Sequence, residues 1–331
     1  MTILVTGGCG YIGSHTLVLL LNYGYNVLVL DNLSNSELSV ISKIEDLCGK
    51  PIKFIEGDIR DRKLLNAIFR DHEVKAVIHF AGLKSVGDSS KQPVEYYDVN
   101  VAGTLSLLSA MKTAGCNKIV FSSSATVYGD SSIVPIQESF PLSSNNPYGA
   151  SKLVVENILT EISMTDSEWS ASILRYFNPI GAHSSGLIGE NPKGTPNNLV
   201  PYIARVAAGV YDKVLVFGGD YPTKDGTGIR DYIHVMDLAR GHIKALEAIL
   251  EKTGVIKVNL GTGQGYSVLD VICSFEKVSG VKIPYEIVGR RLGDIGECYA
   301  DPTYALEVLD WRAELDLLQM CKDTWRWQKL S

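Results

Sequence analysis

The feature that most constrains the fold of this chain is a glycine-rich loop at its start. A short apolar segment at residues 3–5 leads into the loop at residues 6–13, and an apolar-faced helix follows. Gly7, Gly10 and Gly13 form the pattern G-x-x-G-x-x-G, which allows a tight turn and close approach of the backbone to a pyrophosphate. The free N–H groups at the start of such a helix then attract phosphate. We expect a dinucleotide-binding site here; the alternative is a purely structural glycine turn.

Alternating strands and helices follow this loop. Buried strands are expected at residues 27–30, 52–55, 76–80, 118–122 and 171–176, with helical patterns between them. This alternation predicts an α/β fold of the Rossmann type, a doubly wound parallel sheet with helices on both faces. After about residue 178 the loops become longer, and a strand at 214–217 and a helix at about 235–250 are expected. We predict an NAD-binding domain at 1–178 and a smaller α/β substrate domain at 179–331, with some later elements packing back on the first.

Two acidic residues follow strands of the first half. Asp31 ends the second strand, about 20 residues beyond the glycine loop, where a carboxylate binds an adenosine ribose and repels a 2′-phosphate. NAD is therefore favoured over NADP. Asp58 ends the third strand and is a candidate for the adenine amino group, with a helix N-cap as the alternative.

The candidate catalytic pair is Tyr148 and Lys152. Positions i and i+4 share one face of a helix, so the two side chains point the same way. A free tyrosine has a pKa of about 10, and lowering it to about 7 takes roughly 4 kcal/mol. A cation about 4 Å away supplies about that much at an effective dielectric near 20. Since an oxidised nicotinamide ring adds positive charge, Tyr148 is expected to act as a general base. A chance pair of polar residues on an amphipathic helix is the alternative.

A run of small hydroxyl residues ends the strand at 118–122. In a doubly wound sheet, ligands bind at the carboxyl ends of the strands. Ser124 is therefore expected to bridge the substrate oxygen and Tyr148, with Thr126 as a weaker second candidate. Ordinary turn chemistry is the alternative for a serine at this position.

Composition narrows the class of protein. The chain has 331 residues, a net charge of −6 and 45% hydrophobic residues, so it lacks the basic balance of a nucleic-acid or anionic-lipid binder. Its six cysteines form no C-x-x-C pair, so neither a zinc site nor a redox motif is predicted and no metal is expected. The start has no signal-peptide pattern and no apolar run is long enough to span a membrane. We expect a cytoplasmic protein.

Together these residues resemble the extended short-chain dehydrogenase/reductase family and, within it, the UDP-hexose 4-epimerases. The resemblance runs from Ile3 to Trp327 and is specific. It rests on the segments 5–15, 30–36, 79–84, 122–129, 175–179, 196–199 and 228–235, and on Tyr148 with Lys152.

The resemblance implies two sets of ligand contacts. NAD would be held by Gly7, Gly10, Tyr11, Ile12, Gly13, Asp31, Asn32, Leu33, Ser34, Asn35, Ser36, Asp58, Ile59, Phe80, Ala81, Gly82, Leu83, Lys84, Asn100, Ser124, Tyr148, Lys152 and Phe177. The UDP-sugar would be held by Lys84, Ser124, Thr126, Tyr148, Asn178, Asn198, Leu199, Val216, Phe217, Arg230, Tyr232, Arg291, Asp294 and Cys298. The chemistry suits these types, because arginine forks bind phosphate oxygens in pairs and an aromatic ring such as Phe217 stacks on uracil.

The implied reaction inverts carbon 4 of a UDP-hexose. Tyr148, helped by Ser124, would take the proton of the 4-hydroxyl while hydride moves to NAD; the 4-keto sugar would turn, and hydride would return to the opposite face. NAD is regenerated in each cycle, so the net reaction is an isomerisation that interconverts UDP-glucose and UDP-galactose.

Two positions depart from the family pattern. Leu292 replaces a carboxylate beside the phosphate-binding Arg291. Cys298 stands where members restricted to UDP-glucose and UDP-galactose often carry tyrosine. Because cysteine is much smaller, we expect room for an N-acetyl group and hence activity on UDP-GlcNAc and UDP-GalNAc. The alternative is that Cys298 is a small apolar packing residue.

Other functions remain open. A sugar-nucleotide dehydratase or decarboxylase of the same family would need a carboxylate beside the first hydroxyl, but Ala125 and Thr126 follow Ser124. A non-catalytic NAD-sensing protein would not need Ser124, Tyr148 and Lys152. The resemblance also suggests a homodimer that pairs through the helices at 101–114 and 152–162.

Overall fold

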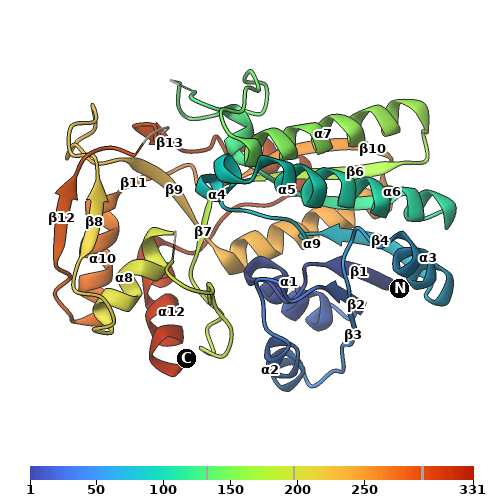
Figure 1. Cartoon of the computed structure of the whole chain (residues 1–331), viewed down its shortest axis with the longest axis horizontal. Coiled ribbons are helices and arrows are strands. Elements are labelled where there is room, and N and C mark those ends of the chain that lie inside the picture. Colours follow the sequence, from blue (N-terminus) through green and yellow to red (C-terminus); the bar gives the residue numbers. More distant parts are fainter. Residues whose placement is uncertain (132, 197, 292–293) are drawn as a thin grey trace.

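The computed structural model describes residues 1–131, 133–196, 198–291 and 294–331. Its centre is a seven-stranded parallel sheet in the order β10-β6-β5-β4-β1-β2-β3 (Figure 1). These strands are β1 (Thr2–Thr6), β2 (Asn26–Asp31), β3 (Lys53–Glu56), β4 (Val74–His79), β5 (Lys118–Ser124), β6 (Ser170–Tyr176) and β10 (Gly254–Leu260). The predicted Rossmann-type parallel sheet is confirmed. The strand β10 was not predicted.

Helices cover both faces of this sheet because successive strand residues are apolar on alternate sides. In β1, Ile3 and Val5 belong to one core cluster and Leu4 belongs to the other. The first cluster is closed by α1 (Tyr11–Asn22), α2 (Ser39–Cys48), α9 (Val235–Glu251) and α11 (Thr303–Leu309). The second is closed by α3 (Arg62–Asp71), α6 (Gly103–Thr113) and α7 (Pro147–Thr165). Short helical segments α4 (Val86–Lys91), α5 (Pro93–Tyr97), η1 (Asp98–Ala102) and η2 (Ala125–Tyr128) connect these elements.

A smaller group of elements lies beside the carboxyl ends of the central strands, at the left of Figure 1. Its strands are β7 (Asn178–Ile180), β9 (Ile229–His234), β11 (Gly265–Ser267) and β13 (Glu297–Cys298), and a separate pair, β8 (Val214–Phe217) with β12 (Tyr285–Val288). Its helices are α8 (Leu199–Ala207), α10 (Val268–Ser279) and α12 (Leu317–Leu330), which share a third core cluster.

The second half of the chain contributes to both groups of elements. Helix α9 packs against α1, and β10 extends the central sheet beside β6. The predicted division between residues 178 and 179 therefore does not separate two hydrophobic cores. That the two parts bind different ligands stays a prediction. No helix within the described residues is both long and apolar enough to span a membrane.

Candidate functional site

The glycine loop is tightly enclosed between β1 and β4. Gly7 has a left-handed φ of +69°, and a Cβ there would lie 2.6 Å from the backbone nitrogen of Ala81. A Cβ on Gly13 would lie 2.5 Å from the carbonyl oxygen of Gly7. Side chains are thus excluded at both positions. At the carboxyl end of β1, the first turn of α1 therefore exposes backbone groups in place of side chains. This cradle fits the pyrophosphate of a dinucleotide.

Asp31 joins the glycine loop to the loop that follows β2. Its Oδ2 accepts a hydrogen bond from the backbone nitrogen of Cys9 (3.0 Å), and its Oδ1 accepts from the backbone nitrogen of Leu33 and from Ser36 Oγ (both 2.9 Å). Leu33 takes a left-handed φ of 56°, which this carboxylate supports. The exposed Asn32, Ser34 and Asn35 complete the loop. The carboxylate therefore shapes the predicted ribose-binding loop and keeps lone pairs free for a further donor.

Asp58 is paired rather than placed at a helix end. Arg60 Nη2 lies 2.8 Å from its Oδ2, and Asn32 donates to the same oxygen at 3.1 Å. The hydrogen bond from Arg60 lowers the pKa of Asp58 to about 2, so this carboxylate is charged at neutral pH. The N-cap of α3 is Asp61, not Asp58. The alternative interpretation of Asp58 as a helix N-cap is therefore wrong.

The predicted cofactor segment at 80–84 follows β4 and is fastened by Asn100. The side chain of Asn100 accepts from the Leu83 nitrogen (2.7 Å) and donates to the Leu83 oxygen (3.0 Å) and to Ser151 Oγ (2.9 Å). A Cβ on Gly82 would lie 2.9 Å from Asn100 Oδ1 and 3.8 Å from Lys152 Nζ. Asn100 therefore binds this segment to α7 beside Lys152, and its predicted contact with NAD stays a prediction.

Five residues predicted to bind NAD lie around the same strand ends. Tyr11 donates to the carbonyl oxygen of Gly181 at 2.6 Å, which ties the start of α1 to the end of β7. Phe80 packs beside His242, with ring centroids 4.7 Å apart. Ile59 and Phe177 are buried, at 5% exposure each. Ile12 packs on the first core cluster.

The catalytic candidates meet where β5 ends and α7 begins. Asn146 caps α7 by accepting from the Gly149 nitrogen at 2.9 Å, so the helix starts immediately before Tyr148. Lys152 is buried; its Nζ donates to the Ser122 oxygen at 2.7 Å and lies 5.9 Å from the centroid of the Tyr148 ring. The structure thus brings β5, Tyr148 and Lys152 together.

Hydroxyl groups at the end of β5 complete this arrangement. Ser124 Oγ accepts from the nitrogen and the Oγ1 of Thr126, at 3.2 and 3.0 Å. Burial raises the pKa of Tyr148, and the hydrogen bond with Ser124 lowers it. Sequence reasoning expected the charge of Lys152 to outweigh such effects. Removal of the phenol from water is the larger effect in the protein alone, so burial opposes formation of the phenolate.

A buried ion pair supports α7 one turn beyond Lys152. Glu156 and Arg175 are 0% and 1% exposed, and Arg175 Nη2 lies 2.6 Å from Glu156 Oε2. Ser123 Oγ also donates to Glu156, at 2.5 Å. Burial lowers the pKa of Lys152 to about 8, while the negative charge of Glu156 raises it. The pair therefore joins α7 to β5 and β6 and favours the charged form of Lys152.

Hydrogen bonds continue from Arg175 toward β10. Arg175 Nη1 donates to Tyr128 OH at 2.8 Å, and Tyr128 donates to Asn259 Oδ1 at 2.7 Å. Asn259 Nδ2 donates to the Ile136 oxygen at 2.9 Å. Ile136 in turn bridges to Ala300, two residues after Cys298. This network connects the helix of Tyr148 with the segment of Cys298.

The predicted substrate residues gather around a cavity of about 360 Å³. Nine of them line it: Asn178, Asn198, Leu199, Val216, Phe217, Arg230, Tyr232, Arg291 and Asp294. Lys84, Ser124, Thr126, Tyr148 and Cys298 do not line it. Sequence reasoning missed several wall residues, including Thr195, Tyr202, Leu215, Tyr221, Gly228 and Val268. Tyr221 and Gly228 both precede the predicted Arg230 by fewer than ten residues, and that proximity was the available signal.

Two arginines dominate the charge of this cavity. The guanidinium of Arg291 lies 3.9 Å from the centroid of the Phe217 ring, stacked on a ring that we predicted to bind uracil. Arg230 lies 3.8 Å from an oxygen of Asp294 and donates to the Ile229 and Ile295 carbonyls, at 2.9 and 3.0 Å. Because guanidinium groups bind phosphate oxygens in pairs, this wall is suited to a diphosphate.

Cys298 connects the cavity to the catalytic centre. It is paired with Arg230 in the parallel register of β13 and β9. Its side chain packs in the cluster that contains Ala125, Tyr128 and Leu153, which are neighbours of Ser124 and Lys152 in sequence or space. Burial raises the pKa of Cys298 to about 11, so it is a neutral thiol.

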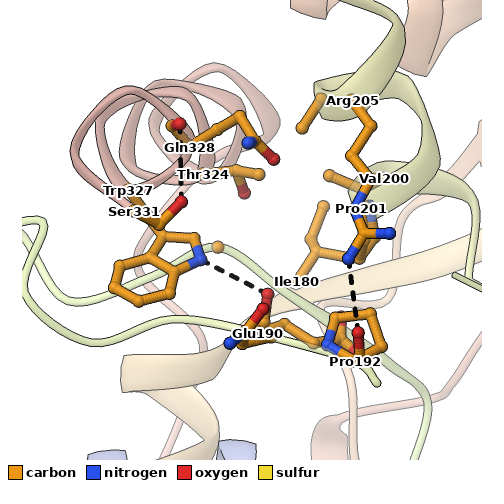
Figure 2. A pocket seen from close by; sticks show the side chains of 13 residues that line it. Ile180, Glu190, Pro192, Val200, Pro201, Arg205, Thr324, Trp327, Gln328 and Ser331 are labelled. Carbon is orange, nitrogen blue, oxygen red and sulfur yellow. Dashed lines mark hydrogen bonds between the residues drawn. The ribbon is translucent and has the colours of Figure 1, made fainter. Parts of the chain in front are cut away.

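Glu190 is a site residue that sequence reasoning did not find. One oxygen of its carboxylate accepts from Asn198 Nδ2 at 2.9 Å and lies 3.2 Å from Lys84 Nζ. Its backbone oxygen accepts from Trp327 Nε1 at 3.3 Å, at the wall of a second cavity of about 60 Å³ (Figure 2). None of the predicted ligand-binding residues lines this smaller cavity. Glu190 thus connects two predicted ligand-binding residues, Lys84 after β4 and Asn198 at the start of α8.

Two positions of the sequence analysis, residues 197 and 292, lie outside the described residues. The replacement at Leu292 is among them. Groups of three or more histidine, cysteine, aspartate or glutamate side chains arranged to hold a metal are absent from the part of the chain that the structure describes.

A parallel sheet with this cradle and this tyrosine–lysine helix defines an NAD-dependent enzyme class. A model of the NAD dependent epimerase/dehydratase family matches residues 3–261, and the chain belongs to this family. It is 56% identical over 328 residues to the UDP-glucose 4-epimerase of Bacillus subtilis, covering 99% of this chain and 97% of that protein.

Two solved structures are also similar to the chain. The UDP-glucose 4-epimerase of Stenotrophomonas maltophila, with bound NAD and formylated UDP-arabinopyranose, has 51% identity and a TM-score of 0.98, covering 100% and 98% of the two chains. That of Bifidobacterium longum, in complex with NAD+ and UDP, has 51% identity and a TM-score of 0.96 with the same coverage.

Proposed function

We propose that this protein is an NAD-dependent UDP-glucose 4-epimerase. The proposal rests on one observation: Tyr148, Lys152 and Ser124 lie together at the carboxyl end of β5, beside a cavity whose wall presents Arg230 and Arg291. A base beside a dinucleotide cradle serves any dehydrogenase. Here the base is connected through Cys298 to a cavity wall that is suited to a diphosphate. This combination indicates that the substrate is a sugar nucleotide, in agreement with the names of the relatives.

The first half of the chain supplies the NAD site. Gly7 and Gly13 leave space for a pyrophosphate, and Asp31 shapes the ribose loop. These residues would hold NAD, which when bound would supply the hydride acceptor and donor for carbon 4 of the sugar. Asp31 disfavours a 2′-phosphate by repulsion, which makes NAD the expected dinucleotide.

The residues of α7 and β5 move the proton. Tyr148 takes the proton of the 4-hydroxyl and gives it back after the sugar has turned. Ser124 lies close enough to Tyr148 to lower the pKa of its phenol, and it orients the phenol. Lys152 donates to the Ser122 oxygen, so its ammonium is fixed where it stabilises negative charge on the phenol.

The second half of the chain, residues 179–331, supplies the UDP site. Arg230 and Arg291 bind the diphosphate, and Asn198 and Phe217 contact the uracil. An anchor of this kind holds the nucleotide while the keto sugar rotates. Hydride return to the opposite face then inverts carbon 4.

A panel of four UDP-sugars tests this function. We expect the purified protein to interconvert UDP-glucose and UDP-galactose without added cofactor, and denaturation to release NAD. No keto product should accumulate, since Ala125 stands where a dehydratase needs a carboxylate. Release of a 4-keto-6-deoxy sugar would assign the protein to the dehydratase branch instead.

We further propose that Cys298 admits N-acetyl sugars. Its side chain packs in the cluster with Ala125 and Leu153, where it occupies much less volume than a tyrosine ring would. Cys298→Tyr should abolish turnover of UDP-GlcNAc while UDP-glucose turnover persists; Cys273→Tyr, at an exposed position, is the matched control. Equal N-acetyl-sugar turnover in wild type and Cys298→Tyr would contradict the proposal.

A homodimer is the assembly that we propose. Apolar side chains are exposed together along α5, α6 and α7: Val94 (80%), Tyr97 (40%), Leu105 (43%) and Val154 (36%). In Figure 1 these helices lie next to one another. Sedimentation of the NAD-loaded protein measures the assembly, and a monomer at micromolar concentration would contradict it.

We propose the cytoplasm as the site of action. All six cysteines are free thiols, which is typical of proteins from a reducing compartment. Cell fractionation with detection of the epimerase activity tests this assignment.

A further inference from the structure

Tyr221 is a buried residue of the cavity wall whose polar group has no partner. It is 6% exposed, and its hydroxyl oxygen makes no hydrogen bond with the described residues. Three other buried tyrosine hydroxyls are paired: Tyr96 donates to Ser85, Tyr128 donates to Asn259, and Tyr176 hydrogen-bonds His242. Tyr221 therefore differs from these three buried phenols.

The ring of Tyr221 is fixed in place by its surroundings. A Cβ on Gly218 would lie 2.4 Å from its Cε2, so glycine is needed there to admit the ring. The guanidinium of Arg290 lies 4.1 Å from the ring centroid, and the Tyr221 nitrogen donates to the Gly226 oxygen at 2.9 Å. Since the ring is held by Arg290, by Gly218 and by its own backbone hydrogen bond, the hydroxyl has little freedom to turn toward another partner.

Charged groups of the cavity surround this hydroxyl. Burial is the largest influence and raises the pKa of Tyr221; Asp294 raises it further, and Arg290 and Arg230 lower it. The phenol is therefore neutral and carries a proton that it can donate. Arg230 and Asp294 line the same cavity, so the donor lies on the wall that we assign to the diphosphate.

An unpaired buried hydroxyl costs stability in the ligand-free protein. Phenylalanine at this position would keep the packing and avoid that cost. We propose that Tyr221 is an additional substrate-binding residue, whose hydroxyl donates to an oxygen of the diphosphate of the nucleotide sugar. This inference rests on the proposed function, because it takes the cavity to be the nucleotide site. The hydroxyl is unpaired until the ligand supplies its acceptor.

The test is Tyr221→Phe in the NAD-loaded enzyme, with two readouts of opposite sign. Titration calorimetry should show UDP binding weakened about tenfold or more, the size expected for a hydrogen bond to a charged acceptor. Uridine, which lacks phosphate, should bind with unchanged affinity. The thermal midpoint of the nucleotide-free enzyme should be equal to or above that of wild type. Tyr96→Phe is the matched control: it removes a paired hydroxyl, and should lower the midpoint without changing the UDP affinity.

Each other outcome decides against the inference. An unchanged UDP affinity shows that the hydroxyl does not touch the nucleotide, and an equal loss for uridine moves the contact away from the diphosphate. A lowered midpoint shows that the hydroxyl has a partner in the free enzyme. Wild-type protein that fails to bind UDP would instead overturn the proposed function, which separates the two failures.

Discussion

The helix of Tyr148 and the wall of the nucleotide cavity treat their polar side chains in opposite ways. Beneath α7, Glu156 and Arg175 are paired with each other, and Arg175 extends the network to Tyr128 and Asn259. In the cavity wall, Arg291 stacks on an aromatic ring and the Tyr221 hydroxyl has no partner among the described residues. The first region is complete before any ligand arrives. The second has hydrogen-bonding capacity left for one.

This difference separates two requirements of catalysis. A proton-transferring group must already be oriented when the substrate binds, which demands a rigid surround. A binding wall gains affinity when polar groups find their partners in the ligand and not in the protein. We therefore expect substitutions at α7 to change rate or stability, and substitutions in the wall to change affinity.

The largest effect is expected for Tyr148→Phe. The substitution keeps the ring and removes the group that exchanges the proton, so kcat for UDP-galactose should fall by about 10²- to 10⁴-fold. UDP affinity should stay near the wild-type value. Tyr23→Phe, at an exposed position after α1, is the control. Epimerisation at the wild-type rate would refute the role of Tyr148.

A large loss of stability is expected for Glu156→Gln. Removing one charge of a buried pair leaves Arg175 uncompensated, which costs about 3–5 kcal/mol. Urea unfolding of the NAD-loaded protein measures this cost. The half-exposed pair of Lys213 and Glu286, 2.5 Å apart, offers the matched control Glu286→Gln, for which about 1 kcal/mol or less is expected. Similar losses of unfolding free energy in Glu156→Gln and Glu286→Gln would show that the pairing beneath α7 does not contribute more to stability than a surface pair does.

A smaller effect concerns pH. The pKa of Lys152 is lowered to about 8 by burial, and a lysine is charged only below its pKa. Its charge beside Tyr148 is therefore lost as the pH rises through about 8, and kcat/KM should decline on this alkaline side. Lys152→Arg, which stays charged, should have a lower rate but no such decline. A wild-type profile that stays flat well above this pH would show that Lys152 keeps its proton.

Local sequence pattern predicted much of the fold and the site. The glycine spacing, the apolar strands and the i, i+4 pair of Tyr148 and Lys152 all act over short distances, so the sequence contains their full signal. The nine predicted residues around the large cavity came from the family resemblance, since they are spread over β7, α8, β8, β9 and the loops between elements.

Features that depend on distant contacts were not predictable. Strand β10 joins the sheet beside β6 although more than 70 residues and several elements separate them in the chain. Glu190 belongs to the site only because the fold brings Lys84 and Asn198 into contact with its carboxylate. The raised pKa of Tyr148 depends on how completely the fold removes water from the phenol, which no spacing of residues encodes.

The short strand β13 has one further consequence. Because Cys298 and Arg230 are partners in the ladder between β13 and β9, the strand pairing fixes the separation between the arginine that we propose as the nucleotide anchor and the side chain that we propose to limit sugar size. The Ala300 nitrogen also donates to Asp231, at 3.1 Å, which holds the far end of this short strand. A change of side chain at 298 can therefore alter which sugars fit without displacing the anchor. Substrate range in such a protein can diverge by single substitutions while the chemistry at carbon 4 is conserved.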